Sequence, residues 1–222
     1  ISAVVNDLFY EGNLLNGITE MDRSPLLDWL PTLCFFNVNG TEQIGRDNSF
    51  YNMAEVYFIS KLIQSLTASG IEGSMIGVIT LYKSQMFKIY NLLSSIHSDA
   101  LEIKAVQVST VDAFQGAEKE IIVLSCVRTR QVGFIDSEKR MNVALTRGKR
   151  HLLIVGNLAC LSKNKLWGCV IHHCAGRENG LQHISQYEER LNIILKHYLE
   201  KKKEEENNRQ KKEIKKSVSQ KV

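Results

Sequence analysis

The 222-residue sequence predicts an α/β domain with a doubly wound, mostly parallel sheet and helices on both of its faces. Two observations support this prediction. Short, wholly apolar stretches bounded by turn residues are typical of strands that are buried on both sides. Amphipathic stretches of helical period separate them, and alternation of strand and helix favours a parallel sheet. The length suffices for one sizeable core and an appendage.

Five short stretches are the predicted strands. The first follows a connector that holds both prolines of the chain, Pro25 and Pro31, and a segment of weak helical period over residues 2–16 precedes that connector. After the first strand, a polar loop is expected from Asn39 to Asp47. The predicted strands are Thr32–Val38, Ile76–Ile79, Val106–Val111, Ile121–Val127 and Leu152–Val155.

Three helices are predicted between these strands. Ser49 is a candidate N-cap for a helix that ends before Gly70, and apolar residues at helical spacing extend over Lys83–Ile96. Asp136 or Ser137 would cap a third helix that ends near Arg147, with Gly148 as its C-terminal stop.

The chain changes character after residue 182, so we expect three parts: a main domain over 1–182, an amphipathic helix over 183–200 and a charged tail over 201–222. The tail has too few apolar residues to form a core and is predicted to be a solvated helix extension or disordered. From Glu200 onward, nine Lys or Arg face five Glu, which accounts for the whole net charge of +4. Nucleic-acid binding by the main domain must therefore rest on local residues.

Composition argues against several classes of protein. The apolar stretches are far too short to cross a bilayer, so no membrane partner is predicted. The chain starts at Ile1, which suggests a fragment of a longer protein, and five irregularly spaced cysteines suit a reducing cytosol or nucleus. The four residues Cys169, His172, His173 and Cys174 crowd together, but their spacing matches no structural zinc pattern. We predict a helix with partly buried cysteines there and no metal site.

The segment from Ser109 to Glu118 is the first candidate for chemistry. A strand is predicted to end at Val111, and the carboxyl edge of a parallel sheet is where such folds bind ligands. Gly116 would allow close backbone approach, and Gln115 and Glu118 offer groups for ribose hydroxyls or a phosphate-bound water. The alternative is an ordinary polar loop.

The segment from Arg140 to Arg147 is the second candidate. Seven residues separate the two arginines, so two helical turns place them on nearly the same face, where they could reach a phosphate. The alternative is an amphipathic helix with solvated cations.

Gly148-Lys149 precedes Arg150 and lacks the spacing of a phosphate-binding loop, which occurs nowhere in the chain. Nor does an Asp-Glu pair follow a strand to hold magnesium, so a nucleotide triphosphate would have to be bound mainly elsewhere.

Four ordered blocks within residues 1–182 resemble the C-terminal motor domain of superfamily 1B helicases, the senataxin-like group. The block over residues 1–14 resembles the segment after a Tyr-Arg-x-His-Pro motif, and Ile76–Gln85 resembles motif IV. Thr110–Glu118 is similar to motif V and Arg140–Arg147 to motif VI. Within the group, the chain is most similar to helicases with a GRF-type zinc finger.

The resemblance implies a RecA-like fold and a role for each site residue. Arg147 would be an arginine finger toward the γ-phosphate, supported by Arg140. The nucleotide cleft would be lined by Gln115 and Gly116, with Glu118 at the ribose; a single strand would be held by Thr80, Tyr82 and Thr110. Two departures from the family pattern are Leu81, usually proline, and Gly148, commonly alanine.

The resemblance also implies an activity. The full-length protein would be an ATP-dependent 5′-to-3′ helicase of single-stranded nucleic acid, DNA favoured over RNA, that acts in the nucleus in DNA repair. ATP and Mg²⁺ would be bound mainly by a first RecA-like domain, the intramolecular partner of this one. The alternatives are an RNA helicase of the same group, an inactive helicase-like scaffold, a metal-binding module around Cys169–Cys174, and a cytoplasmic location.

Overall fold

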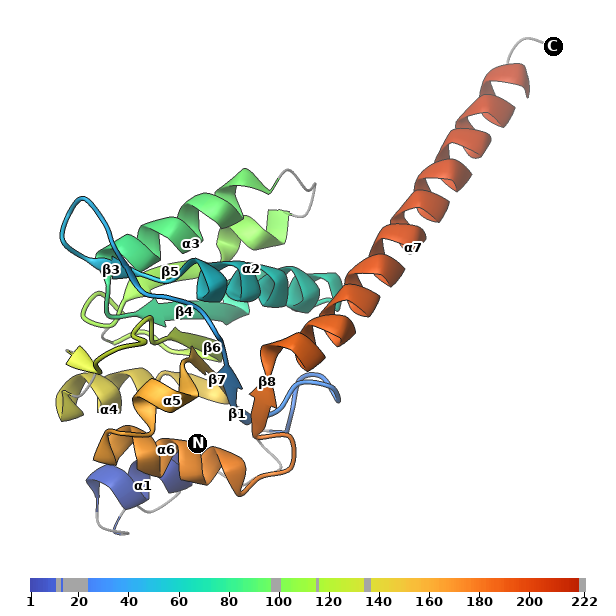
Figure 1. The fold of residues 1–222 in the computed structure, drawn as a ribbon. Helices are drawn as coiled ribbons and strands as arrows, with labels where there is room; N and C mark the ends of the chain where they lie inside the picture. Colours follow the sequence, from blue (N-terminus) through green and yellow to red (C-terminus); the bar gives the residue numbers. More distant parts are fainter. Residues whose placement is uncertain (11–12, 14–23, 97–100, 115, 134–136, 220–222) are drawn as a thin grey trace.

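A six-stranded parallel sheet forms the centre of the molecule (Figure 1). The computed structural model describes residues 1–10, 13, 24–96, 101–114, 116–133 and 137–219. The sheet has the strand order β5-β4-β6-β7-β1-β8. Its strands are β1 (Leu33–Asn37), β4 (Ile76–Thr80), β5 (Gln107–Thr110), β6 (Lys119–Ser125), β7 (Gly148–Gly156) and β8 (Leu181–His183). Every pair is parallel, which confirms the predicted fold class.

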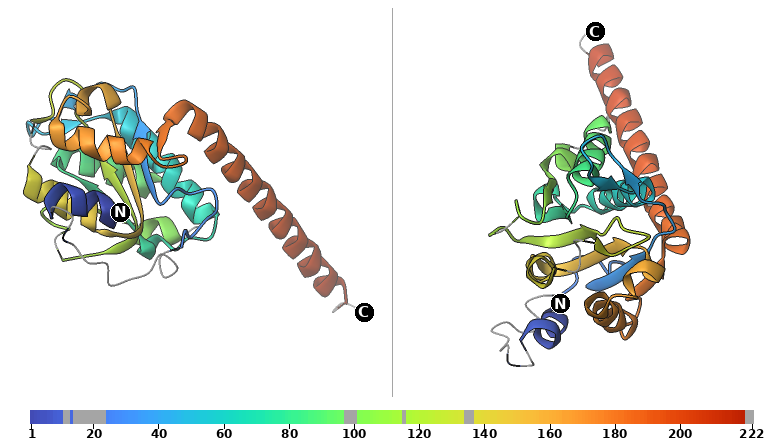
Figure 2. Two further views of the ribbon diagram at one scale, coloured as in Figure 1. Left: turned by 90° about the horizontal axis from the view of Figure 1, so that it is seen from below. Right: turned by 60° about the vertical axis from the view of Figure 1, so that its left-hand side comes forward.

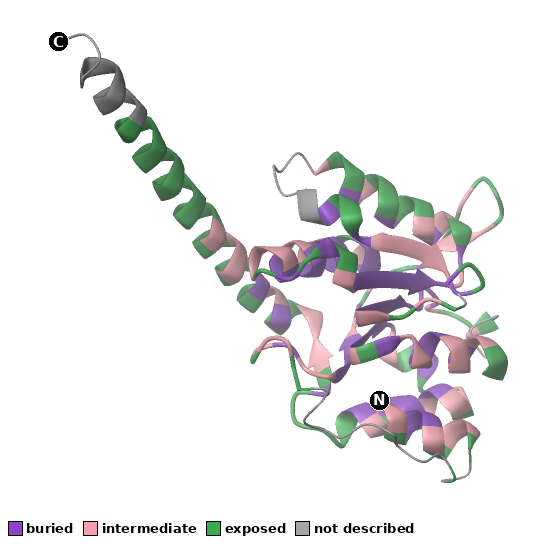
Figure 3. Cartoon of the chain, turned by 180° about the vertical axis from the view of Figure 1, so that it is seen from behind, coloured by how far each residue is buried: buried purple, intermediate pink, exposed green. Residues whose placement is uncertain are grey.

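Helices cover both faces of this sheet, as the two views of Figure 2 show. One face carries α1 (Ser2–Phe9), α4 (Glu138–Thr146), α5 (Leu158–Leu161) and α6 (Lys165–Ala175). The other carries α2 (Met53–Ala68), α3 (Lys83–Ser95), the first turns of α7 (Ile184–Ser219) and two 3-10 turns, Gly73–Met75 and Leu101–Ala105. A separate apolar core fills each interface, and burial in Figure 3 concentrates on the sheet and on α2.

Burial on both sides explains the apolar strands. All five residues of β4 are buried, and Val78 lies in register between Val108 of β5 and Val123 of β6. β-branched residues in adjacent strands pack well on such a surface. The helices α3 and α4 lie on opposite faces of the sheet. Side chains from the two faces can therefore meet only at the ends of the strands, in the connecting loops.

Several local expectations were wrong. The helix α2 begins at Met53, not after Ser49, because the Asn52 side chain caps it by accepting the Ala54 N–H at 3.1 Å. The expected polar loop contains strand β2 (Gln43–Ile44), paired with β3 (Phe50–Tyr51). Gly148 does not stop a helix in a left-handed conformation; it is the first residue of β7. The short strand β8 was not anticipated.

The C-terminal region is a single helix up to Ser219, so α7 covers the predicted helix and most of the predicted tail. Its first turns pack on α2 through Tyr187 and Leu191, whereas residues 199–212 are exposed and project from the body (Figure 3). The boundary at residue 182 falls inside β8. Among the described helices, none is long and apolar enough to cross a membrane.

Candidate nucleotide and single-strand site

The segment between β5 and β6 runs from one edge of the sheet to the other. Both strands lie parallel to β4, so the chain must return from the carboxyl edge at Thr110 to the amino edge at Lys119. Phe114 anchors this crossing in the core beneath α4. The expectation that the polar groups of this segment gather at the carboxyl edge is therefore wrong for Glu118, which directly precedes β6 and is exposed.

Gly116 turns the chain within this crossing. Its φ is +85°, and open space surrounds the position of a Cβ atom, so the backbone conformation is what favours glycine there. Gln115, the other residue predicted to line the cleft, lies outside the described residues.

The helix α4 brings the two predicted motifs together. The Arg140 guanidinium makes a two-pronged contact with Asp112, from Nε to Oδ1 and from Nη2 to Oδ2, at 3.2 Å each. At the other end of α4, the Arg147 carbonyl accepts the Lys119 N–H at 3.0 Å. The Arg140 and Asp112 side chains remain 42% and 66% exposed, so an incoming anion could compete for Arg140.

Arg147 follows the last residue of α4, and its side chain folds back onto that helix. Nε donates to the Val143 carbonyl at 3.0 Å, and Nη2 donates to Thr146 Oγ1 at 2.8 Å. Thr146 Oγ1 itself donates to the Asn142 carbonyl, so its own donor stays satisfied if the guanidinium leaves. Arg147 is half-buried and makes no ion pair that would hold it there within the described part of the chain.

The three residues predicted to contact single-stranded nucleic acid lie at the carboxyl edge of the sheet. Thr80 and Thr110 are direct neighbours in register on β4 and β5. The Thr80 side chain is fully buried and its Oγ1 accepts the Tyr82 N–H at 3.4 Å; Tyr82 is 5% exposed. Only Thr110 is partly open to solvent. Strand contacts by the Thr80 and Tyr82 side chains stay a prediction, one that requires this edge to open.

A buried ion pair next to Tyr82 was missed by the sequence analysis. Arg128, in the loop after β6, donates to Glu42 from Nε and Nη2 at 3.2 and 3.3 Å and from Nη1 to Tyr82 Oη at 3.4 Å. Its guanidinium also lies 4.0 Å from the centroid of the Phe50 ring. This pair therefore ties the β2–β3 hairpin to the loop that leads from β6 to α4.

Acid should expose the contribution of Glu42. Burial alone would raise the pKa of this carboxyl, but the Thr129 N–H, the Arg128 guanidinium and the Arg130 N–H outweigh it and lower the pKa below 4.5. Because the folded-state pKa of Glu42 lies below its unfolded-state pKa, the ionised carboxylate stabilises the fold at pH values above the unfolded-state pKa. This stabilisation is lost as the pH falls through the folded-state pKa. We expect Glu42→Gln to be less stable than the unaltered chain at pH 7, with a difference that shrinks below about pH 4.5. Urea unfolding at pH 7, 5 and 3 checks this; a difference independent of pH would contradict it.

A second buried carboxyl group, that of Glu55, holds the start of the same loop. Both of its oxygens accept the Val127 N–H, at 2.9 and 3.0 Å, and Oε2 accepts from Ser125 Oγ at 2.6 Å. Gln85 of α3 donates to the same Ser125 hydroxyl at 2.8 Å. Burial raises the pKa of Glu55 to about 8, against the opposing effect of these hydrogen bonds. Glu55 therefore links α2, α3 and the end of β6.

Val127, whose N–H donates to Glu55, has a strained backbone. Its φ is +71°, and the Arg128 N–H donates to the Cys126 carbonyl at 2.7 Å, which makes a γ-turn centred on Val127. A β-branched residue in this conformation costs on the order of 1–3 kcal/mol.

One signal in the sequence could have revealed Glu55, since it continues the buried stripe of Ile59, Leu62 and Leu66 at helical spacing.

The Cys–His segment lies within α6, which confirms the predicted helix. Cys174 is buried and Cys169 is exposed, and His173 lies 3.2 Å from Asp7. Burial raises the pKa of the Cys174 thiol to about 12, which disfavours the thiolate that binds metal. Among the described residues, no three His, Cys, Asp or Glu side chains are grouped so as to hold a metal ion.

Comparison with known proteins agrees with this architecture. The AAA domain family model matches residues 1–159. The chain is 73% identical over 201 residues to the mouse (Mus musculus) protein named 5′-3′ DNA helicase ZGRF1, which covers 90% of this chain and 11% of the relative. It is 35% identical to regulator of nonsense transcripts 1 of Caenorhabditis elegans, over 80% of this chain and 18% of the relative. It is 37% identical to ATP-dependent helicase NAM7 of Saccharomyces cerevisiae, over 81% and 20%.

The chain thus spans about a tenth to a fifth of the length of these relatives. The blocks that resemble motifs IV, V and VI fall on β4, on the crossing between β5 and β6, and on α4, all within the matched region. With a six-stranded parallel sheet covered on both faces, the chain belongs to the AAA domain family and is a RecA-like domain of the superfamily 1 helicases.

Proposed function

We propose that this chain is the second motor domain of an ATP-dependent 5′-to-3′ helicase and supplies the arginine finger, Arg147. The observation that supports it best is the meeting of the two motifs, in which Arg140 of α4 pairs with Asp112 of the β5–β6 crossing. Beyond the other end of α4, the Arg147 carbonyl accepts the N–H of Lys119, the residue that follows the crossing. Arg140 and Arg147 suit the phosphates of a nucleotide, and the exposed carboxylate of Glu118 suits its ribose hydroxyls.

The residues of this chain fit a role at one side of a shared ATP site. Bound ATP would supply the phosphoryl group that is transferred to water, and Mg²⁺ would neutralise charge on the phosphate oxygens. Arg147 would leave its contacts with Val143 and Thr146 and spread the charge that develops on that group. Arg140 would orient this face of α4, with Gln115, Gly116 and Glu118 lining the nucleotide side. The first RecA-like domain would bind the triphosphate and the metal.

The proposal assigns single-stranded DNA as the track. Identity to the mouse DNA helicase is 73%, against 35% to the nematode regulator of nonsense transcripts, so the DNA relative supports this assignment more strongly. Thr110 and the backbone at the ends of β4 and β5 would contact phosphates and sugars rather than bases. A nuclear location and a role in DNA repair belong to the same proposal.

Unwinding assays with the full-length protein test polarity and track together. We expect ATP-dependent unwinding of a duplex with a 5′ single-stranded DNA tail, and at least about tenfold slower unwinding of the same duplex with a 3′ tail or an RNA tail. Preference for the RNA tail would favour an RNA helicase instead, the second candidate, which the 35% identity to the nonsense regulators supports. Equal rates with 5′ and 3′ tails would contradict the assigned polarity.

A further inference from the structure

We infer that Glu55 is a positioning residue of the motor. It clamps the strained Val127 turn and so couples the part of the domain proposed to bind single-stranded DNA to α4, the helix that Arg147 follows. This inference rests on the proposed function. Its two central residues, Glu55 of α2 and Val127 of the loop after β6, lie outside the blocks that resemble helicase motifs.

Side chains from the start of α2 hold both polar groups of Val127. Glu55 accepts its N–H with both carboxylate oxygens, and Asn52 Nδ2 donates to its carbonyl at 3.3 Å. All three residues are fully buried, so water does not replace these contacts. A valine does not keep a positive φ unless its surroundings impose it. Glu55 and Asn52 are the groups that impose it.

The clamp is itself fixed from two directions. Ser125 Oγ at the end of β6 donates to Glu55 and accepts from Gln85 of α3. Gln85 in turn accepts the Asn52 N–H at 2.8 Å. The Glu55 carboxyl group therefore has little freedom to move, because α2, α3 and the end of β6 enclose it.

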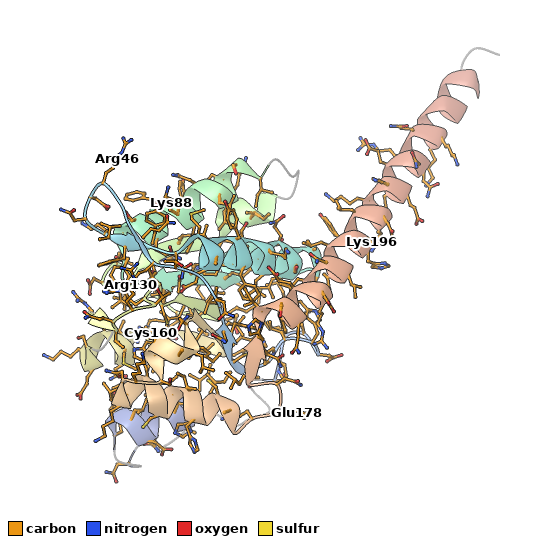
Figure 4. The ribbon with its side chains drawn as sticks, viewed as in Figure 1. Arg46, Lys88, Arg130, Cys160, Glu178 and Lys196 are labelled. Carbon is orange, nitrogen blue, oxygen red and sulfur yellow. The ribbon has the colours of Figure 1, made fainter. Side chains whose placement is uncertain are left out.

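The clamped turn determines where the next residue points. Arg128 reaches Glu42 and Tyr82 at the carboxyl edge, next to the ends of β4 and β5 where a strand is proposed to lie. Gly133, with φ +61°, packs so closely against the Arg128 guanidinium that a Cβ there would lie 2.4 Å from Nη1. Figure 4 shows Arg130 of this loop on the same side of the molecule as Arg46 and Lys88.

The side chain of Val127 packs in the same buried core as Met141 and Leu145 of α4. Arg147 directly follows α4, so a change in the Val127 turn would be felt at the helix that positions Arg147. With the clamp intact, movement of Tyr82 and of the end of β4 when single-stranded DNA binds can be passed through Arg128 and Val127 to α4. With the clamp lost, Val127 relaxes to a negative φ and the two sides are uncoupled.

A double-mutant cycle in the full-length protein tests the clamp. Glu55→Ala should lower the stimulation of ATP hydrolysis by single-stranded DNA by about tenfold or more, with a smaller change in unstimulated hydrolysis. Val127→Gly alone should stay within about threefold of wild type, because glycine adopts positive φ without strain. In the Val127→Gly background, Glu55→Ala should lose most of its effect. Glu55→Gln, which keeps an amide oxygen for the Val127 N–H, should retain most of the stimulation.

Hydrogen exchange of the peptide covering residues 124–133 gives a readout that does not need an active motor. Faster exchange in Glu55→Ala than in Glu55→Gln supports the clamp, and equal exchange in these variants and wild type overturns it. Unchanged stimulation in Glu55→Ala overturns the coupling role. So does a loss that Val127→Gly fails to rescue in protein that remains folded. A wild type without any stimulation would instead overturn the proposed function, while the exchange data still decide the clamp.

Discussion

Arg147→Ala in the full-length protein is expected to lower kcat for ATP hydrolysis by about a thousandfold while leaving ATP affinity within a few-fold of wild type. An arginine finger acts on charge that develops in the transition state, so its loss should affect turnover far more than ground-state binding. In the free domain this side chain rests on Val143 and Thr146, contacts that add little to the fold. Steady-state hydrolysis and fluorescent ATP-analogue binding measure the two effects.

Two comparisons make this prediction specific. Arg177→Ala, the same chemical change at an exposed position beyond α6, should leave kcat unchanged. Arg147→Lys should recover only a small part of the rate, because an ammonium group does not reproduce the planar fork of a guanidinium. Normal turnover by Arg147→Ala would remove this residue from the site.

Phe36→Ala is expected to cost about 3–5 kcal/mol of the free energy of unfolding. Phe36 lies on β1, is fully buried, and packs against Phe58 of α2 and Tyr187 of α7, with ring centroids 5.1 and 4.7 Å apart. The substitution would leave a cavity where sheet, α2 and α7 meet. Urea unfolding of the chain, followed by circular dichroism, measures the loss.

The matched control is Phe87→Ala on α3, where the ring is 54% exposed. Its effect should stay within about 0.5 kcal/mol, since little apolar surface is buried there. Similar losses for the two phenylalanines would contradict the packing of α7 on this core.

The sequence predicted the parts of the fold that depend on local pattern. Apolar runs such as Ile76–Thr80 are buried on both sides, and the period of Lys83–Ser95 matches a helix on the surface of a sheet. The hairpin of β2 and β3 and the three-residue strand β8 were missed, because such short strands are stabilised by long-range pairing rather than by their own composition.

The candidate site was predicted unevenly for a similar reason. Arg140 and Arg147 can be placed on one helix from their spacing, but Asp112 as the partner of Arg140 depends on the crossing beneath α4. Glu118 was expected at the carboxyl edge of the sheet. It lies at the amino edge, because the chain crosses the sheet between β5 and β6. Glu55 and Val127 are separated by 72 residues, and only the fold shows that one holds the other.

The most direct test of the central claim is ATP hydrolysis by the wild-type full-length protein, measured with and without single-stranded DNA. A helicase motor in which this domain completes the ATP site predicts hydrolysis that rises by about tenfold or more with the strand. Absence of hydrolysis both with DNA and with RNA would contradict the claim and favour a helicase-like scaffold that binds nucleic acid without turnover.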